Sequence, residues 1–168
     1  MKRIVFMFLI GMFLSAPNAW ATSSRSIGLG VSLGVAFPEG DDLKQEVQVD
    51  DWQASFNWGF YVNIPLISTF HITPSAELYK IEDQNATDIS LAFKFIVPIA
   101  FLDLYVGAVP GLTTVNDIHA LNIGGLLGVS FNMISNLDFF AQFKYKILFH
   151  GNENVRVMHA NAGVLFAF

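Results

Sequence analysis

The chain has 168 residues, enough for one domain with a sizeable core. Its formal net charge of −5 argues against nucleic-acid binding, which needs a basic surface, and the absence of cysteine excludes disulfides. Although 53% of the residues are apolar, no stretch after the N-terminal region approaches 18 uninterrupted apolar residues, so the sequence predicts no transmembrane helix.

The N-terminal region has the composition of a secretory signal peptide. Lys2-Arg3 precedes an apolar run of eleven residues, Ile4 to Leu14, and Ala19-Trp20-Ala21 supplies a small-x-small cleavage site. The alternative, a membrane anchor, would need about 20 apolar residues. We therefore expect a signal peptide over residues 1–21 and one exported domain over residues 22–168, in which seven basic residues face fourteen acidic ones.

Bulky and small side chains alternate in the first segment of that domain. A period of two predicts a β-strand with two different faces. The small set is Gly28, Gly30, Ser32, Gly34 and Ala36. The bulky set, which we expect to face lipid, is Ile27, Leu29, Val31, Leu33 and Val35.

The alternation recurs in seven more segments of about ten residues, the length that a tilted membrane-spanning strand needs. The connections after the second, fourth and sixth segments are short, whereas the others are more polar and the first, residues 38–51, is the longest. Short turns at one end and longer loops at the other are typical of bacterial outer-membrane barrels. The seven segments are 52–64, 70–79, 88–97, 102–112, 121–131, 137–147 and 158–168.

The alternative fold is a soluble barrel with the bulky residues inside. Its outer face would then carry the small side chains of the first segment, which make a poor soluble surface but fit the narrow interior of an eight-stranded barrel. Bulky apolar side chains that face lipid avoid the cost of exposure to water. We therefore predict an all-β fold, an eight-stranded antiparallel up-and-down transmembrane β-barrel, closed by pairing of its first and last strands.

The chain ends in Asn161-x-Gly163-x-x-Phe166-x-Phe168. This pattern resembles the C-terminal signal by which the barrel assembly machinery recognises outer-membrane barrels. The resemblance implies an assembly-signal role for Asn161, Gly163, Phe166 and Phe168.

Three interior segments resemble a known family. They are Ile72-x-Pro74-x-x-Glu77-Leu78-Tyr79, Tyr105-Val106-Gly107-Ala108-x-Pro110-Gly111, and Asn122-Ile123-Gly124-Gly125 through Phe131. They are similar to the small outer-membrane β-barrel family that includes the transmembrane domain of outer membrane protein A and the opacity-type, porin-like surface proteins. That family usually has Gly where Val109 stands and no Pro at 110. The resemblance implies a location in the bacterial outer membrane, in contact with its lipid and lipopolysaccharide.

The predicted inward faces carry six charged side chains. Glu77 and Lys94 lie on neighbouring segments and form the predicted charge pair in the lumen. One interpretation is a small ion channel. The other is a filled lumen in which opposite charges pair, because an unpaired buried charge is costly, and the narrow bore favours it. The six are Glu77, Lys94, Asp103, Asp138, Lys144 and Lys146.

The sequence offers little catalytic or metal-binding chemistry. His71, His119, His150 and His159 match no zinc-ligand spacing, and the best candidate pair is His150 with Glu153. The lipid A deacylase that shares this fold uses a His-x-Ser pattern, but no Ser or Thr follows Ser135. We therefore predict no catalytic, cofactor-binding or metal-binding residues and expect no enzyme.

The loops are expected to carry the biological role, because the barrel of this architecture is a scaffold. The first loop is acidic and could bind divalent cations, bind a basic partner, or simply be solvated. The preferred hypothesis is a structural or surface-interaction protein with an unidentified extracellular partner. A lipid A-modifying enzyme and a small ion channel are the alternatives.

Overall fold

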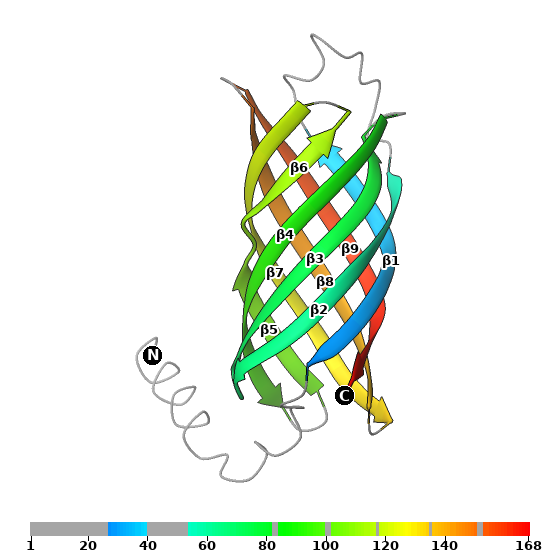
Figure 1. Ribbon diagram of the computed structural model, residues 1–168, viewed down its shortest axis with the longest axis vertical. Helices are drawn as coiled ribbons and strands as arrows, with labels where there is room; N and C mark the ends of the chain where they lie inside the picture. The colour runs from blue at the N-terminus through cyan, green and yellow to red at the C-terminus, as the bar shows by residue number, and fades with distance from the viewer. Residues whose placement is uncertain are drawn as a thin grey trace, which may run out of the picture.

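The structure is a computed structural model that describes residues 27–39, 54–81, 84–99, 102–116, 118–134, 136–150 and 153–168. These residues form one antiparallel sheet that closes into a barrel (Figure 1). The predicted signal peptide, residues 1–21, lies outside the described residues. The strands are β1 (Gly28–Glu39), β2 (Ser55–Ile67), β3 (Phe70–Ile81), β4 (Gln84–Ile99), β5 (Leu102–Ala108), β6 (Gly111–Val115), β7 (Ile118–Ile134), β8 (Leu137–His150) and β9 (Glu153–Ala167).

The fifth of the eight predicted passes is divided into β5 and β6 at Pro110. The register against β4 continues unchanged across the break. Val109 exchanges both backbone hydrogen bonds with Gly124 of β7, at 2.8 and 3.0 Å. The Pro110 carbonyl accepts a hydrogen bond from the Leu91 amide of β4 at 2.9 Å, but proline has no N–H with which to return it. The described residues therefore form nine strands but make eight passes.

The first and last strands close the barrel, as predicted. β1 and β9 pair along their length, from Gly28 opposite Ala167 to Glu39 opposite Arg156. Every pass therefore has a hydrogen-bonded neighbour on both sides. This matters in lipid, where no water is available to an unpaired strand edge.

The strands are strongly tilted (Figure 1). We followed the paired residues from strand to strand once around the barrel, starting at Phe37 of β1 and ending at Ile64 of β2. Because the preceding residue, Asn63, pairs with Gly28, Ile64 lies opposite Ile27 of β1. This displacement of ten residues along β1 in an eight-pass barrel corresponds to a tilt of roughly 40°. The chain end, the start of β1 and the β2–β3 turn all lie at one end of the barrel, called here the short-turn end (Figure 1).

Large apolar side chains cover the outer surface. Among the predicted lipid-facing residues, Ile27, Leu29, Val31 and Leu33 are 47–61% exposed, and Val35 is partly exposed. No helix in the described part of the chain is long and apolar enough to cross a membrane. Further exposed apolar residues on the other passes are Phe56, Trp58, Phe60, Ile89, Phe95, Val106, Leu121, Ile123, Leu127, Phe143 and Phe166.

The inner face has the opposite character along most of its length. It is lined by small and polar side chains, and many of the polar ones are buried. Among the described residues, two clusters of buried apolar side chains also lie inside the barrel: one on β4, the fifth pass and β7, made of Ala92, Ile96, Tyr105, Val109 and Leu126, and the other, called here the apolar cluster, toward the loop end, opposite the short-turn end. This apolar cluster consists of Ala36, Tyr79, Ala86, Ala120, Leu148 and Val157.

Candidate functional site

Glu77 of β3 lies at the centre of a buried polar network in the lumen. One carboxylate oxygen, Oε1, accepts hydrogen bonds from the Tyr61 hydroxyl and, at 2.6 Å, from the Asn161 amide. The other, Oε2, lies 2.9 Å from Nζ of Lys144 and 3.8 Å from Nζ of Lys146. Side chains from β2, β8 and β9 thus converge on one carboxylate across the bore.

Asp88 of β4 forms a second centre on the neighbouring wall. Its Oδ1 lies 2.6 Å from Nζ of Lys146, and its Oδ2 accepts hydrogen bonds from Thr113 at 2.7 Å and Asn122 at 2.9 Å. Ser90 also donates to Oδ1, at 2.6 Å. Lys146 therefore connects the Asp88 centre to the Glu77 centre.

Four charged side chains make up this interior ion network: Glu77, Asp88, Lys144 and Lys146. Their formal charges cancel, and the side chains are at most 1% exposed. Buried ions are tolerated only when they are paired and their remaining hydrogen-bonding groups are satisfied. The network and the apolar cluster together fill the middle and the loop end of the bore with side chains.

The predicted pair of Glu77 with Lys94 is not formed. Both side chains belong to inward faces of neighbouring strands, but Glu77 is opposite Asp88, whereas Lys94 is opposite His71. Asp88 and Lys94 are six positions apart on β4, which is about 20 Å along the strand. Lys144, not Lys94, is the cation that pairs with Glu77.

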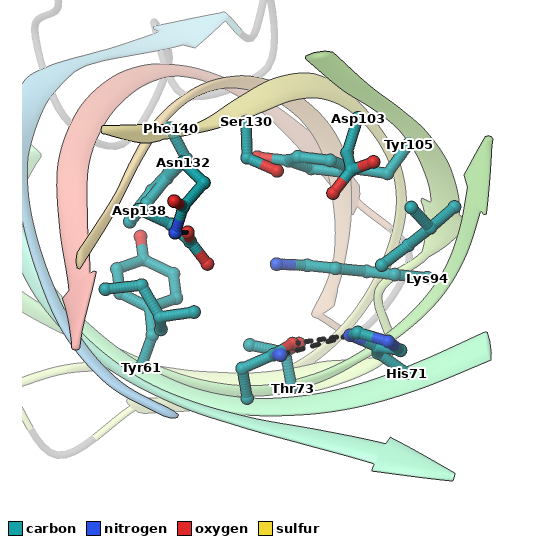
Figure 2. A pocket seen from close by; sticks show the side chains of 13 residues that line it. Tyr61, His71, Thr73, Lys94, Asp103, Tyr105, Ser130, Asn132, Asp138 and Phe140 are labelled. Atoms are coloured by element: carbon teal, nitrogen blue, oxygen red, sulfur yellow. Dashed lines mark hydrogen bonds between the residues drawn. The ribbon is translucent and has the colours of Figure 1, made fainter. Parts of the chain in front are cut away.

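Lys94 instead reaches into a cavity of about 60 Å³ near the short-turn end. Its Nζ lies 4.8 Å from the centre of the Tyr105 ring. Figure 2 shows the lysine extending across the cavity, with Asp103 and Asp138 on other parts of the wall. Beside it, His71 is held through Nδ1 by the Asn63 side chain, at 3.0 Å from its Nδ2 and 3.3 Å from its Oδ1. The charged residues predicted to face inward are thus divided between the ion network and this cavity.

The four predicted C-terminal residues lie on β9 and just beyond it. Phe166 and Phe168 are 50% and 63% exposed at the short-turn end, with ring centroids 6.4 Å apart. Gly163 faces inward, where the Phe140 ring leaves no room for a side chain. Asn161 is buried in the lumen and bonded to Glu77, a contact that the terminal pattern did not predict.

The histidines do not come together. His71 and His159 are buried at different levels of the lumen, whereas His119 is exposed and bonded to Thr114 at 2.9 Å. The β8–β9 register places His150 opposite Glu153. Within the described residues, no three His, Cys, Asp or Glu side chains lie close enough to hold a metal ion.

Sequence reasoning missed Asp88 as a charged residue of the lumen. It has the same parity along β4 as Lys94, so the alternation places both on the inner face. That parity was the signal that could have found it.

Comparison with known proteins finds similarity in structure only. No protein-family model and no curated protein matches the chain. Among solved structures, Neisserial surface protein A superimposes with a TM-score of 0.71 at 19% identity, covering 84% of this chain and 97% of that one. The outer membrane protein OprG from Pseudomonas aeruginosa superimposes with a TM-score of 0.57 at 12% identity, covering 88% of this chain and 98% of that one. Ail, the attachment invasion locus protein of Yersinia pestis, superimposes with a TM-score of 0.53 at 12% identity, covering 84% of this chain and 99% of that one.

These similarities agree with the closed register and the apolar outer surface described above. The chain has the fold of the small outer-membrane β-barrels.

Proposed function

We propose that this protein is an integral barrel of the bacterial outer membrane whose body is a non-conducting scaffold and whose loops carry a structural or surface-interaction role. The observation that carries the proposal is the interior ion network. Four buried charges cancel across the bore, and an apolar cluster fills the interior beyond them.

The outer surface supports membrane insertion. Leu33, Phe56 and Leu121 are each more than 60% exposed, and they belong to three different strands. Burying apolar surface is worth roughly 25 cal/mol per Å², so a belt of such residues strongly favours hydrocarbon over water. Outer-membrane lipid and lipopolysaccharide are the partners that this surface would contact, and the exposed Phe166–Phe168 pair is the part that the assembly machinery would contact.

A channel would need a water-filled path from one end of the barrel to the other. The cavity around Lys94 holds only about 60 Å³, and Tyr61, which lines it, also bonds to Glu77 of the ion network. Ions entering from the short-turn end would therefore meet a charge-balanced, hydrogen-bonded layer. We accordingly favour a scaffold over the channel.

The names of two structural neighbours are consistent with a role at the cell surface. One is called a surface protein and the other an attachment invasion locus protein. Between β1 and β2, residues 40–53 lie outside the described residues; in the sequence, this predicted longest loop is also the most acidic segment, with Asp41, Asp42, Glu46, Asp50 and Asp51 after Glu39 at the end of β1. We propose this loop as the first candidate for contact with an extracellular partner.

The experiment compares bacteria that express the full chain, a chain with residues 40–50 replaced by Gly and Ser at equal length, or no chain. A control variant, Asn136→Gly, changes the opposite end of the barrel. We expect the full chain and the control to increase binding to cultured epithelial cells, and the loop replacement to abolish the increase while folded barrel in the outer-membrane fraction stays constant. Equal binding with and without the loop would contradict the proposed role.

A further inference from the structure

The inner face of β1 carries no side chain at Gly34, where the barrel closes. Gly34 of β1 is paired with Asn57 of β2 on one side and with Asn161 of β9 on the other. The two asparagines are thus two strands apart, with only a glycine between them. This row lies across the seam, defined here as the β1–β9 pairing.

Side chains of β9 reach over Gly34 to β2. The Asn57 amide donates to Oδ1 of Asn161 at 3.0 Å and contacts Nδ1 of His159 at 2.9 Å. Because an amide nitrogen only donates, the His159 ring nitrogen is the acceptor. The Asn161 amide in turn donates to the Tyr61 hydroxyl at 3.2 Å and to Glu77 of β3 at 2.6 Å.

These bonds satisfy the hydrogen-bonding capacity of Tyr61. Its hydroxyl donates to Glu77 and accepts from Asn161 and, at 3.1 Å, from Ser32 of β1. One donor and two acceptor positions are all that a phenol offers. The Tyr61 hydroxyl therefore has a hydrogen-bond partner at each of its three positions.

The bare position is required for this contact. A Cβ atom on Gly34 would lie 2.3 Å from Oδ1 of Asn161 and 2.2 Å from the Ala160 carbonyl. Neither distance is tolerated without displacement. Glycine at this position is what allows β9 and β2 to touch.

We propose that Asn57, Tyr61, Glu77, His159 and Asn161 form a closure cluster that holds the seam shut. Across the seam, backbone pairing joins β9 to β1 alone, whereas the closure cluster also ties β9 to β2 and β3. In chain order, β9 is far from both, so these bonds form only when the last strand meets the first. Opening the seam would break the backbone pairing and unpair several buried polar groups at once.

The Asp88 centre provides a natural contrast. Asn122 of β7 donates to Asp88 at 2.9 Å and to Thr113 of β6 at 2.8 Å. It is buried like Asn161, but its partners lie on the two preceding passes, Thr113 on β6 and Asp88 on β4, away from the seam. Asn122→Ala is therefore the matched control for Asn161→Ala.

The test is hydrogen–deuterium exchange of the full chain in detergent micelles, followed by mass spectrometry of peptides. We expect Asn161→Ala to accelerate amide exchange at least tenfold in β1 and β9 relative to β4 and β7. Asn122→Ala should instead accelerate amide exchange more in β4 and β7 than in β1 and β9. Unchanged exchange at the seam in Asn161→Ala, or equal acceleration around the whole barrel, would overturn the proposal.

A second variant covers the case in which Asn161→Ala does not fold. Asn57→Ala removes the partner on the far side of Gly34 but leaves Asn161 bonded to Glu77 and Tyr61. It should accelerate exchange of the same β1 and β9 amides by severalfold. Protection of the seam equal to that of the unmodified chain would overturn the proposal by itself.

Discussion

Nζ of Lys144 and Oε2 of Glu77 lie 2.9 Å apart inside the barrel, and the two side chains are 1% and 0% exposed. Replacing Lys144 by Met should destabilise the folded barrel by about 3–5 kcal/mol, because it leaves a buried carboxylate short of its nearest cation. Urea titration in lipid vesicles, followed by tryptophan fluorescence, measures the loss.

Two further variants separate the ion pair from a general effect of removing lysine. Lys80→Met, at an exposed position, should change the free energy of unfolding by no more than about 0.5 kcal/mol. The double variant Glu77→Gln with Lys144→Met should be more stable than Lys144→Met alone, since it removes the uncompensated charge. If Lys144→Met proves as mild as Lys80→Met, the pair does not stabilise the fold.

The outer surface leads to a prediction that depends on depth. Leu33, midway along β1, and Leu66, near the short-turn end of β2, are 61% and 54% exposed. Leu33→Arg should cost about 2–4 kcal/mol in a bilayer and Leu66→Arg about 0–1 kcal/mol, because the cost of a charge falls from the midplane to the interface. Equal losses in vesicle urea titrations would mean that the outer surface does not face hydrocarbon.

The passes and their faces were predictable because both depend on local alternation. On β1, the alternate residues from Ile27 to Val35 are directed outward and those from Gly28 to Ala36 inward, because successive side chains of a strand lie on opposite faces. Pro110 was visible in the sequence as a departure from the family pattern, and it is where the fifth pass divides.

The partners of the interior charges were not predictable in the same way. Which inward residues meet depends on the tilt and on the ten-residue displacement around the closed barrel, and neither is encoded within one strand. Lys94 was therefore paired with Glu77, although the register sets Asp88 opposite Glu77. The hydrogen bond that Asn57 donates to Asn161 needs the closed barrel, because their strands lie far apart in the chain.

Phe168 should matter more for assembly than for stability. The Phe168 ring is 63% exposed, and its backbone amide donates one hydrogen bond to Ile27 at 3.1 Å. Burial of one such ring contributes at most about 1.5–3 kcal/mol, too little to determine whether a closed barrel folds.

Deleting Phe168 should therefore leave refolding of the purified chain into detergent nearly normal but reduce heat-modifiable folded protein in outer-membrane fractions of cells. Normal amounts in both settings would remove the assembly-signal role. Failure in both would make Phe168 a structural residue.

We propose that side chains close the bore of the barrel, and single-channel recording in planar bilayers tests this closure most directly. The purified, refolded chain should give no discrete conductance steps above the protein-free bilayer, because the ion network and the apolar cluster leave no continuous aqueous path. Reproducible conductance steps whose frequency rises with the amount of folded protein would contradict closure of the bore.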